Sequence, residues 1–311
     1  MFFAVLASLF SLFICMGLGF LLRRLRVLDD IITSGLSKVL LYAAMPCTVF
    51  LSLQREFSAE LLGESVVAFA VGGASFLVSF ALSNALVVLF RAKDEEKGVW
   101  KFTLTFANVG YAGFPIMMAV YGQEAMIYTS MVTAAFNILA YSLGVYIYAG
   151  KNKAGGKERL GGLKPVLRNP ALISVAVGLV FFIFSLRIPD FLSAAALQFS
   201  NMTTPLSMII VGSILGKCRI AKVFGDAKVY VITAFRLIVF PVALYFILRP
   251  FIENKLTLGV LVYLIGMPAA SLTVILADEH RGNTELASRA VFVSTLLSIV
   301  TIPGLSLLIN N

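Results

Sequence analysis

The sequence predicts an all-α polytopic membrane protein with ten transmembrane helices, arranged as two five-helix halves. Of its 311 residues, 59% are hydrophobic and 13% are charged, whereas a soluble domain carries roughly 25% charged residues. The mean hydropathy is +0.95. Most of the apolar segments reach the ~20 residues needed to cross a hydrocarbon core of ~30 Å. Composition and segment length together therefore favour a chain that lies largely in a lipid bilayer.

The ten expected spans follow one another with short loops between them. They are residues 2–22, 31–53, 64–90, 100–121, 125–149, 169–187, 191–215, 227–248, 256–277 and 286–309. We expect the first span to be a retained helix rather than a signal peptide, because it lacks a positive n-region and arginines follow it directly.

Loop charges predict the orientation. In or beside the loops that follow the odd-numbered spans there are 19 Lys and Arg residues, and there are 4 beside the even-numbered ones. Positive loops stay in the cytoplasm. Both termini should therefore lie on the outer side of the cell membrane. The Gly/Lys-rich segment 151–168 should be a cytoplasmic linker between the halves 1–150 and 169–311. The net charge of +9 does not indicate a nucleic-acid partner, because the positive residues do not form one basic face.

Two of the spans are interrupted at matching points of the halves. Span 4 contains Gly113-Phe-Pro115, and span 9 contains Gly266-Met267-Pro268. Proline removes a backbone donor and glycine adds conformational freedom, so each span should unwind there. Unwound backbone at membrane depth must be buried in protein or line a cavity. Paired interruptions of this kind are typical of the binding site of a secondary transporter.

The halves are predicted to form an inverted repeat. Each half has five spans, an odd number, so the second half must enter the membrane from the opposite side. Pro46 in span 2 and Pro205 in span 7 add a second matching pair. The broken spans 4 and 9 would then cross at the pseudo-two-fold axis.

Polar residues near the interruption are candidates for substrate binding. Asn108 and Gly110 precede the expected break, and Asn137 lies in span 5. Asn108 is expected to line the site one or two turns before the break; an interhelical hydrogen bond is the alternative. Asn137 is open between packing and binding. The N–H groups freed at half-helix N-termini would attract an anion.

Arg236 is the strongest single candidate for substrate binding. It lies ~9–13 Å from the cytoplasmic end of span 8 at 1.5 Å per residue, where a charge costs ~2.5 kcal/mol or more. No acidic residue lies deep in a span, so we expect Arg236 to hold a carboxylate substrate. Snorkelling to the interface, and a salt bridge to Asp278 or Glu279, remain as alternatives.

The run from Asn108 to Pro115, NVGYAGFP, resembles the fourth-helix signature of the auxin efflux carrier family, and the resemblance extends along the chain. It takes in Pro46, Asn137, Arg236–Pro241, Gly266–Pro268, Ser294–Ser298 and Pro303. The family implies a sodium/proton-antiporter-like fold. It also implies a scaffold of helices 1, 2, 6 and 7 and a mobile transport domain of helices 3–5 and 8–10, which move as an elevator.

We therefore expect a plasma-membrane carrier that moves a small organic anion, a carboxylate, and that needs no cofactor. A coupling proton or sodium ion bound at backbone carbonyls, uniport, and a homodimer are all left open. A bile-acid-sodium-symporter-like carrier and a non-transporting sensor or assembly protein are the alternatives. An enzyme is not expected, because the chain has one histidine and its three cysteines lack metal-ligand spacing.

Overall fold

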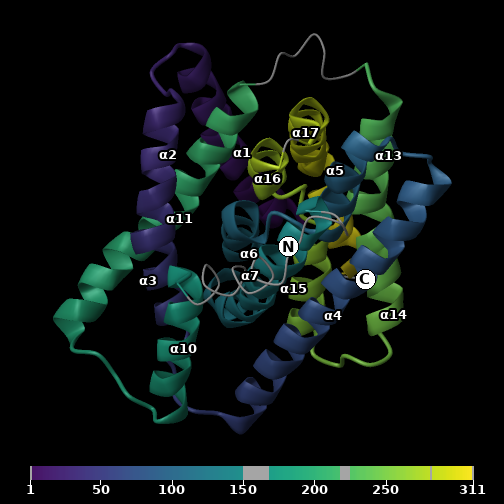
Figure 1. Cartoon of the computed structure of the whole chain (residues 1–311). Helices are drawn as coiled ribbons and strands as arrows, with labels where there is room; N and C mark the ends of the chain where they lie inside the picture. The colour runs from purple at the N-terminus through teal and green to yellow at the C-terminus, as the bar shows by residue number, and fades with distance from the viewer. Residues whose placement is uncertain (1, 150–167, 218–224, 281, 310–311) are drawn as a thin grey trace. The chain divides into compact units, whose positions relative to one another are not determined.

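The computed structural model describes residues 2–149, 168–217, 225–280 and 282–309, and they form helices joined by short connections (Figure 1). The predicted linker 151–168 lies almost entirely outside the described residues, as does Cys218. The chain divides into two compact units. Unit 1 comprises Met1–Phe69, Gly110–Ala134 and Leu167–Lys217; unit 2 comprises Ala70–Val109, Ala135–Val166 and Cys218–Asn311.

Unit 1 contains the N-terminal helices and the first helices of the second half. Its elements are α1 (Phe2–Arg24), α2 (Asp30–Val39), the π-turn η1 (Leu40–Ala44), α3 (Met45–Ser52), the start of α4 (Ala59–Leu89), most of the π-turn η2 (Val109–Gly113), α6 (Phe114–Tyr121), the 3₁₀ turn η3 (Gly122–Ala125), the start of α7 (Met126–Ala149), α10 (Pro170–Ile183) and α11 (Asp190–Gly216).

Glycines allow α1 and α11 to pack at very short range within unit 1. A Cβ on Gly19 would lie 2.2 Å from the carbonyl oxygen of Ile209, and one on Gly212 would lie 1.9 Å from that of Met16. Only a residue without a side chain fits at such a crossing. The α1–α11 pair is thus fixed by small residues at backbone contact.

Unit 2 contains the rest of α4 and α7 and the C-terminal third of the chain. Its other elements are α5 (Asp94–Thr105), α13 (Ala227–Ala234), the π-turn η4 (Phe235–Val239), α14 (Phe240–Leu248), α15 (Lys255–Ile265), α16 (Leu272–Glu279) and α17 (Thr284–Ile309). Helix α17 packs against α5, α13 and α16 (Figure 1). Tilted and edge-to-face ring contacts, with centroids 4.7–5.9 Å apart, join Phe76, Phe102, Phe106 and Phe136, so aromatic packing surrounds the end of α5.

Three prolines share one local geometry. Pro46, Pro115 and Pro241 each stand second in an α-helix that directly follows a π-turn. A wider turn accommodates a residue that cannot donate a backbone hydrogen bond. By contrast, Pro205 and Pro303 lie inside continuous helices. A proline in this chain therefore does not by itself mark an interruption.

The expected break at Pro115 is displaced. Helix α5 ends at Thr105 and helical structure resumes at Val109, so the interruption of span 4 falls at 106–108. Pro115 belongs to the first turn of α6, and Asn108 lies inside the break rather than before it. In span 9 the interruption covers 266–271 and does contain Pro268. The difference arises because the π-turn absorbs Pro115 without ending the helix.

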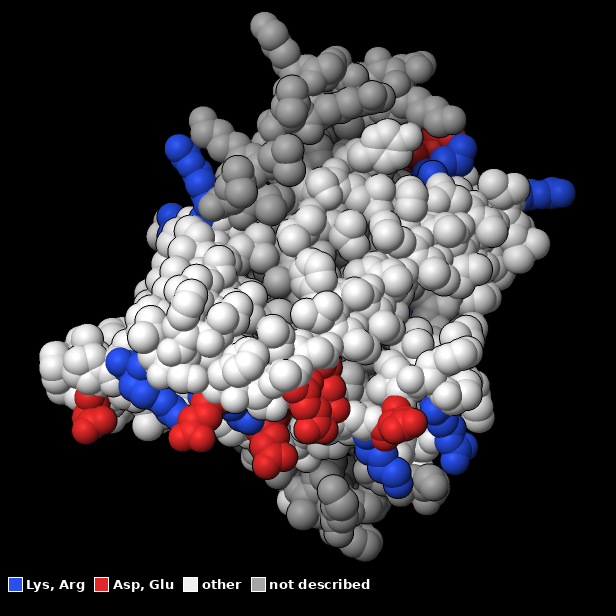
Figure 2. Space-filling model, turned by 90° about the horizontal axis from the view of Figure 1, so that it is seen from below, with Lys and Arg blue, Asp and Glu red and all other residues white. Residues whose placement is uncertain are grey.

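Apolar helices dominate the described part of the chain. Six helical runs within it are long and apolar enough to cross a membrane: Asp30–Ser52, Ala59–Leu89, Val109–Tyr148, Asp190–Gly216, Ala227–Leu248 and Thr284–Ile309. Figure 2 shows a broad uncharged surface with Lys, Arg, Asp and Glu at its margins. These features support a polytopic membrane protein, while the ten-helix, five-plus-five arrangement stays a prediction.

Candidate functional site

The two helix interruptions meet inside unit 2. The backbone N–H of Asn108 donates to the carbonyl of Pro268 at 2.8 Å, and that of Ala270 donates to Phe106 at 3.2 Å. Between them, Ala107 and Ala269 form an antiparallel bridge. Buried backbone groups must be paired. The two unwound segments therefore satisfy part of each other's hydrogen bonding, which is what permits them to remain unwound.

Small polar side chains line this pair of segments. Asn108 is 3% exposed, and its amide Nδ2 lies 3.5 Å from Ser271 Oγ. Ser294 on α17 accepts a hydrogen bond from the N–H of Ala269 at 3.1 Å. Asn108 and Ser271 thus contact each other across the two breaks, and Ser294 supports the backbone of the second break.

Arg236 reaches the same pair of breaks from the π-turn η4. Its side chain is fully buried; Nε donates to the carbonyl of Met267 at 3.2 Å and Nη1 to that of Leu104 at 3.1 Å. Leu104 is in the last turn of α5, and Met267 follows the end of α15. The guanidinium therefore binds one carbonyl at the C-terminal side of each half-helix.

The environment of Arg236 corrects two of the sequence-based interpretations. Complete burial excludes snorkelling to the interface, and within the described ranges Arg236 forms no ion pair with Asp278, Glu279 or another acid. Two neutral backbone carbonyls hold the guanidinium in place of an acid. Its Nη2 is buried and has no hydrogen-bond partner among the described residues.

The other predicted residues are distributed between the two units. Met267, Pro268 and Gly266 belong to the interruption of span 9, and Asn137 is buried on α7 in unit 2. Gly110, Gly113 and Pro115 belong to unit 1. The structure thus brings together Asn108, Arg236 and the residues of the second break.

The glycine at the second break acts through its small size rather than its backbone freedom. Gly266 has a φ of −79°, which any residue adopts. A Cβ there would lie 2.6 Å from Leu305 Cδ1 and 3.2 Å from Pro241 Cβ. At Gly110 the nearest atom to a Cβ would be Met45 Cε at 3.6 Å, an ordinary contact. The only positive φ among the described glycines is at Gly122.

The N-terminus of α16 is less open than the sequence suggests. The N–H of Thr273 donates to Ala270 and that of Val274 donates to Ser271. These two groups of the first turn are therefore already used within the protein. The hydroxyl of Ser271 forms no cap with the helix, so it remains turned to the Asn108 amide instead.

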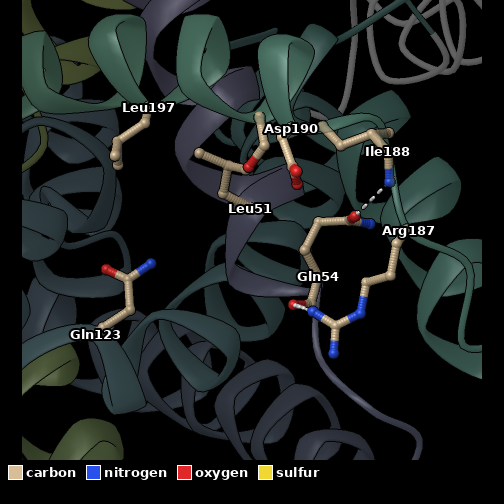
Figure 3. Close-up of a pocket in the computed structure, with 8 residues that line it drawn as sticks. Leu51, Gln54, Gln123, Arg187, Ile188, Asp190 and Leu197 are labelled. Atoms are coloured by element: carbon tan, nitrogen blue, oxygen red, sulfur yellow. Dashed lines mark hydrogen bonds between the residues drawn. The ribbon is translucent and has the colours of Figure 1, made fainter.

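A pocket in unit 1 was not predicted from the sequence (Figure 3). Its volume is about 500 Å³, and its lining comprises Leu51, Gln54, Gln123, Arg187, Ile188, Asp190, Ser193 and Leu197. Arg187 donates to the carbonyl of Gln54 at 2.9 Å. The lining comes from the end of α3 and the residues after it, from η3, from the connection before α11 and from the start of α11, so only the folded chain brings these residues together. None of the sequence-predicted site residues lines it.

The described residues contain no group of three or more His, Cys, Asp or Glu that could hold a metal ion. The side chains and backbone at the paired breaks offer hydrogen bonding by an amide and hydroxyls, together with the positive charge of Arg236. That combination suits recognition of a small anion.

Comparison with known proteins gives matches along nearly the whole chain. The model of a family described as membrane transport protein matches residues 4–162 and 162–306. An uncharacterized transporter of Methanocaldococcus jannaschii is 28% identical over 275 residues, which cover 86% of each chain. An uncharacterized transporter of Methanothermobacter thermautotrophicus is 27% identical over 303 residues, 95% of each chain. A protein of Rhizobium meliloti named as a candidate malonate transporter is 22% identical over 302 residues, which cover 94% of this chain and 92% of that relative.

Proposed function

Because this chain belongs to the auxin efflux carrier family of membrane transport proteins, in its bacterial form, we propose that it carries a small organic anion with a carboxylate group. The family and the names of the relatives identify a membrane transporter and not an enzyme. The substrate class, the mechanism and the residues involved are the proposal.

The buried guanidinium of Arg236 carries the choice of an anion. Its two hydrogen-bond partners are neutral carbonyls, and it has no ion pair in the described ranges. A buried charge without a counterion is costly. A carboxylate that binds beside it supplies that counterion, and Nη2 supplies a donor. The site is thus better suited to a substrate with negative charge than to a neutral or cationic one.

Asn108 and Ser271 provide the neutral contacts of the proposed site. Their side chains lie 3.5 Å apart at the paired breaks, so a ligand oxygen beside the pair can accept hydrogen bonds from both groups. Gly110, Gly113, Pro115, Asn137, Gly266, Met267 and Pro268 are proposed to shape the same site. The name of the Rhizobium meliloti relative makes malonate, a short dicarboxylate, the first substrate to test.

The division into units supports an elevator-type motion. Unit 1 contains the helices of predicted spans 1, 2, 6 and 7, and unit 2 contains those of spans 8–10 with much of spans 3–5. We assign unit 1 to the scaffold and unit 2, with its paired breaks, to the mobile domain. The segment Gly110–Ala134 groups with unit 1, although the family resemblance places spans 4 and 5 in the transport domain. The proposal includes ten spans, a plasma-membrane location and both termini outside.

Uptake by purified protein in liposomes tests this proposal. Radiolabelled malonate and a panel of mono- and dicarboxylates should enter protein-containing liposomes faster than protein-free ones. Asn108→Ala should lower uptake about 2- to 13-fold, the loss of one neutral hydrogen bond of ~0.5–1.5 kcal/mol. Asn84→Ala is the matched control, because its amide donates to the carbonyl of Phe80 on its own helix at 2.8 Å. Uptake unaffected by Asn108→Ala at matched protein amounts would remove Asn108 from the site; absence of uptake for the whole panel would refute the carboxylate class.

A sodium-coupled carrier of the bile-acid-symporter kind is the second candidate. It has the same requirement for broken helices, because unwound carbonyls and half-helix C-termini coordinate sodium in such carriers. A sodium-coupled carrier would need the carbonyls of Leu104 and Met267 to bind sodium. In the first candidate, these carbonyls accept hydrogen bonds from Arg236.

A further inference from the structure

The carbonyl ends of the two half-helices in unit 2 are occupied by a side chain. The C-terminal end of a helix carries partial negative charge on its unpaired carbonyls. An interruption places two such ends, those of α5 and α15, at a buried point. In carriers with broken helices, these ends and the nearby unwound carbonyls are where a coupling cation binds.

In this chain the positive group found there is Arg236. Its Nε and Nη1 donate to the carbonyls of Met267 and Leu104, at 3.2 and 3.1 Å. The guanidinium is permanently charged at physiological pH, and its side chain is fully buried. One side chain therefore neutralises both carbonyl ends at the same time.

A sodium ion would have to compete with this arrangement. To bind either carbonyl, it would approach to ~4 Å from the guanidinium, where two unit charges repel strongly enough to weaken binding roughly a thousandfold at an effective dielectric constant of ~20. Among the described residues, no acidic side chain forms an ion pair with Arg236 that would offset this repulsion. The electrostatics of the breaks thus oppose a second cation.

We infer that Arg236 is a tethered cation that takes the place of a coupling sodium ion at the half-helix ends, so that the substrate anion binds without sodium. The inference rests on the proposed function, since it concerns the ion requirement of the same site. It assigns Arg236 two roles through one charge: holding the carbonyl ends of the breaks, and attracting the carboxylate.

The first measurement needs no substrate. The melting temperature of the purified protein is compared in sodium chloride and in choline chloride at equal concentration. We expect the same value in both salts for the wild type. In Arg236→Ala the two carbonyls lose their donor, and sodium should raise the melting temperature above that in choline. Arg249→Ala, which removes an exposed guanidinium at the end of α14, should respond as the wild type does.

The second measurement replaces sodium by choline on both sides of the liposome membrane during malonate uptake. The rate should change by less than about twofold, a difference of ~0.4 kcal/mol. Sodium-specific stabilisation of the wild type, or uptake that collapses without sodium, would overturn the inference. Folded Arg236→Ala without a sodium response would also overturn it. If no carboxylate is taken up, the proposed function fails, while the melting temperatures still decide the role of Arg236.

Discussion

Replacing Arg236 by glutamine removes the buried charge but retains a polar side chain near the paired breaks. The wild-type guanidinium binds the carbonyls of Leu104 and Met267, and its Nη2 is without a partner in the described structure. If a carboxylate binds Nη2, its loss removes a charge-assisted hydrogen bond of ~1.5–3 kcal/mol. Arg236→Gln should therefore weaken carboxylate affinity about 10- to 150-fold.

The same substitution has two opposing effects on the free energy of unfolding. A glutamine amide can serve one of the two carbonyls, and a carbonyl left without a donor costs ~1–3 kcal/mol. Against this, removing a charge from membrane depth relieves ~2.5–3.5 kcal/mol. The two effects are similar in size, so the free energy of unfolding should change by no more than ~2.5 kcal/mol.

Binding of radiolabelled malonate and melting of the ligand-free protein, measured on the same sample, separate these effects. Arg249→Gln is the control, because that guanidinium lies 5.7 Å from the ring centroid of Tyr245 at the exposed end of α14. Wild-type affinity in well-folded Arg236→Gln would refute the reasoning. A fold that collapses in this variant and is rescued by Asp278→Asn would instead indicate a structural ion pair.

Three further predictions concern packing and orientation. Gly19→Ala should lower the free energy of unfolding by ~1–3 kcal/mol or more, because its Cβ would meet backbone of α11. Gly17→Ala, with open space around it, should leave this free energy unchanged. Equal melting temperatures for the two variants would argue against the close crossing of α1 and α11. Gly266→Ala should lower the free energy of unfolding by ~1–3 kcal/mol, because its Cβ would overlap Leu305 and Pro241. Gly304→Ala, where the space is open, should leave the free energy of unfolding unchanged or raise it. Denaturant unfolding of both variants measures the difference. A single cysteine at Lys157 in a cysteine-free background should react with an impermeant maleimide only after the cells are opened, and labelling of intact cells would reverse the topology.

How far the sequence predicted the site can be judged from the two interruptions. Span 9 unwinds at Gly266–Ser271 as the Gly-x-Pro run indicates. Span 4 unwinds instead at 106–108, because a π-turn compensates for the missing donor of Pro115. Proline chemistry is local and is readable in the sequence, but the choice between a π-turn and a break depends on which carbonyls find partners elsewhere in the fold.

The sequence by itself determined the membrane class and the family and singled out the charge at Arg236, because hydropathy, the NVGYAGFP run and a lone charge in an apolar segment are properties of a linear chain. Only the tertiary structure decided what that charge does. It pairs Asn108 with Pro268 across 160 residues and places the guanidinium on two carbonyls from different half-helices. It also gathers the pocket of unit 1 from helix ends and connections that are far apart in the sequence. Such partners are set by the packing of helices, and no spacing within one segment encodes them.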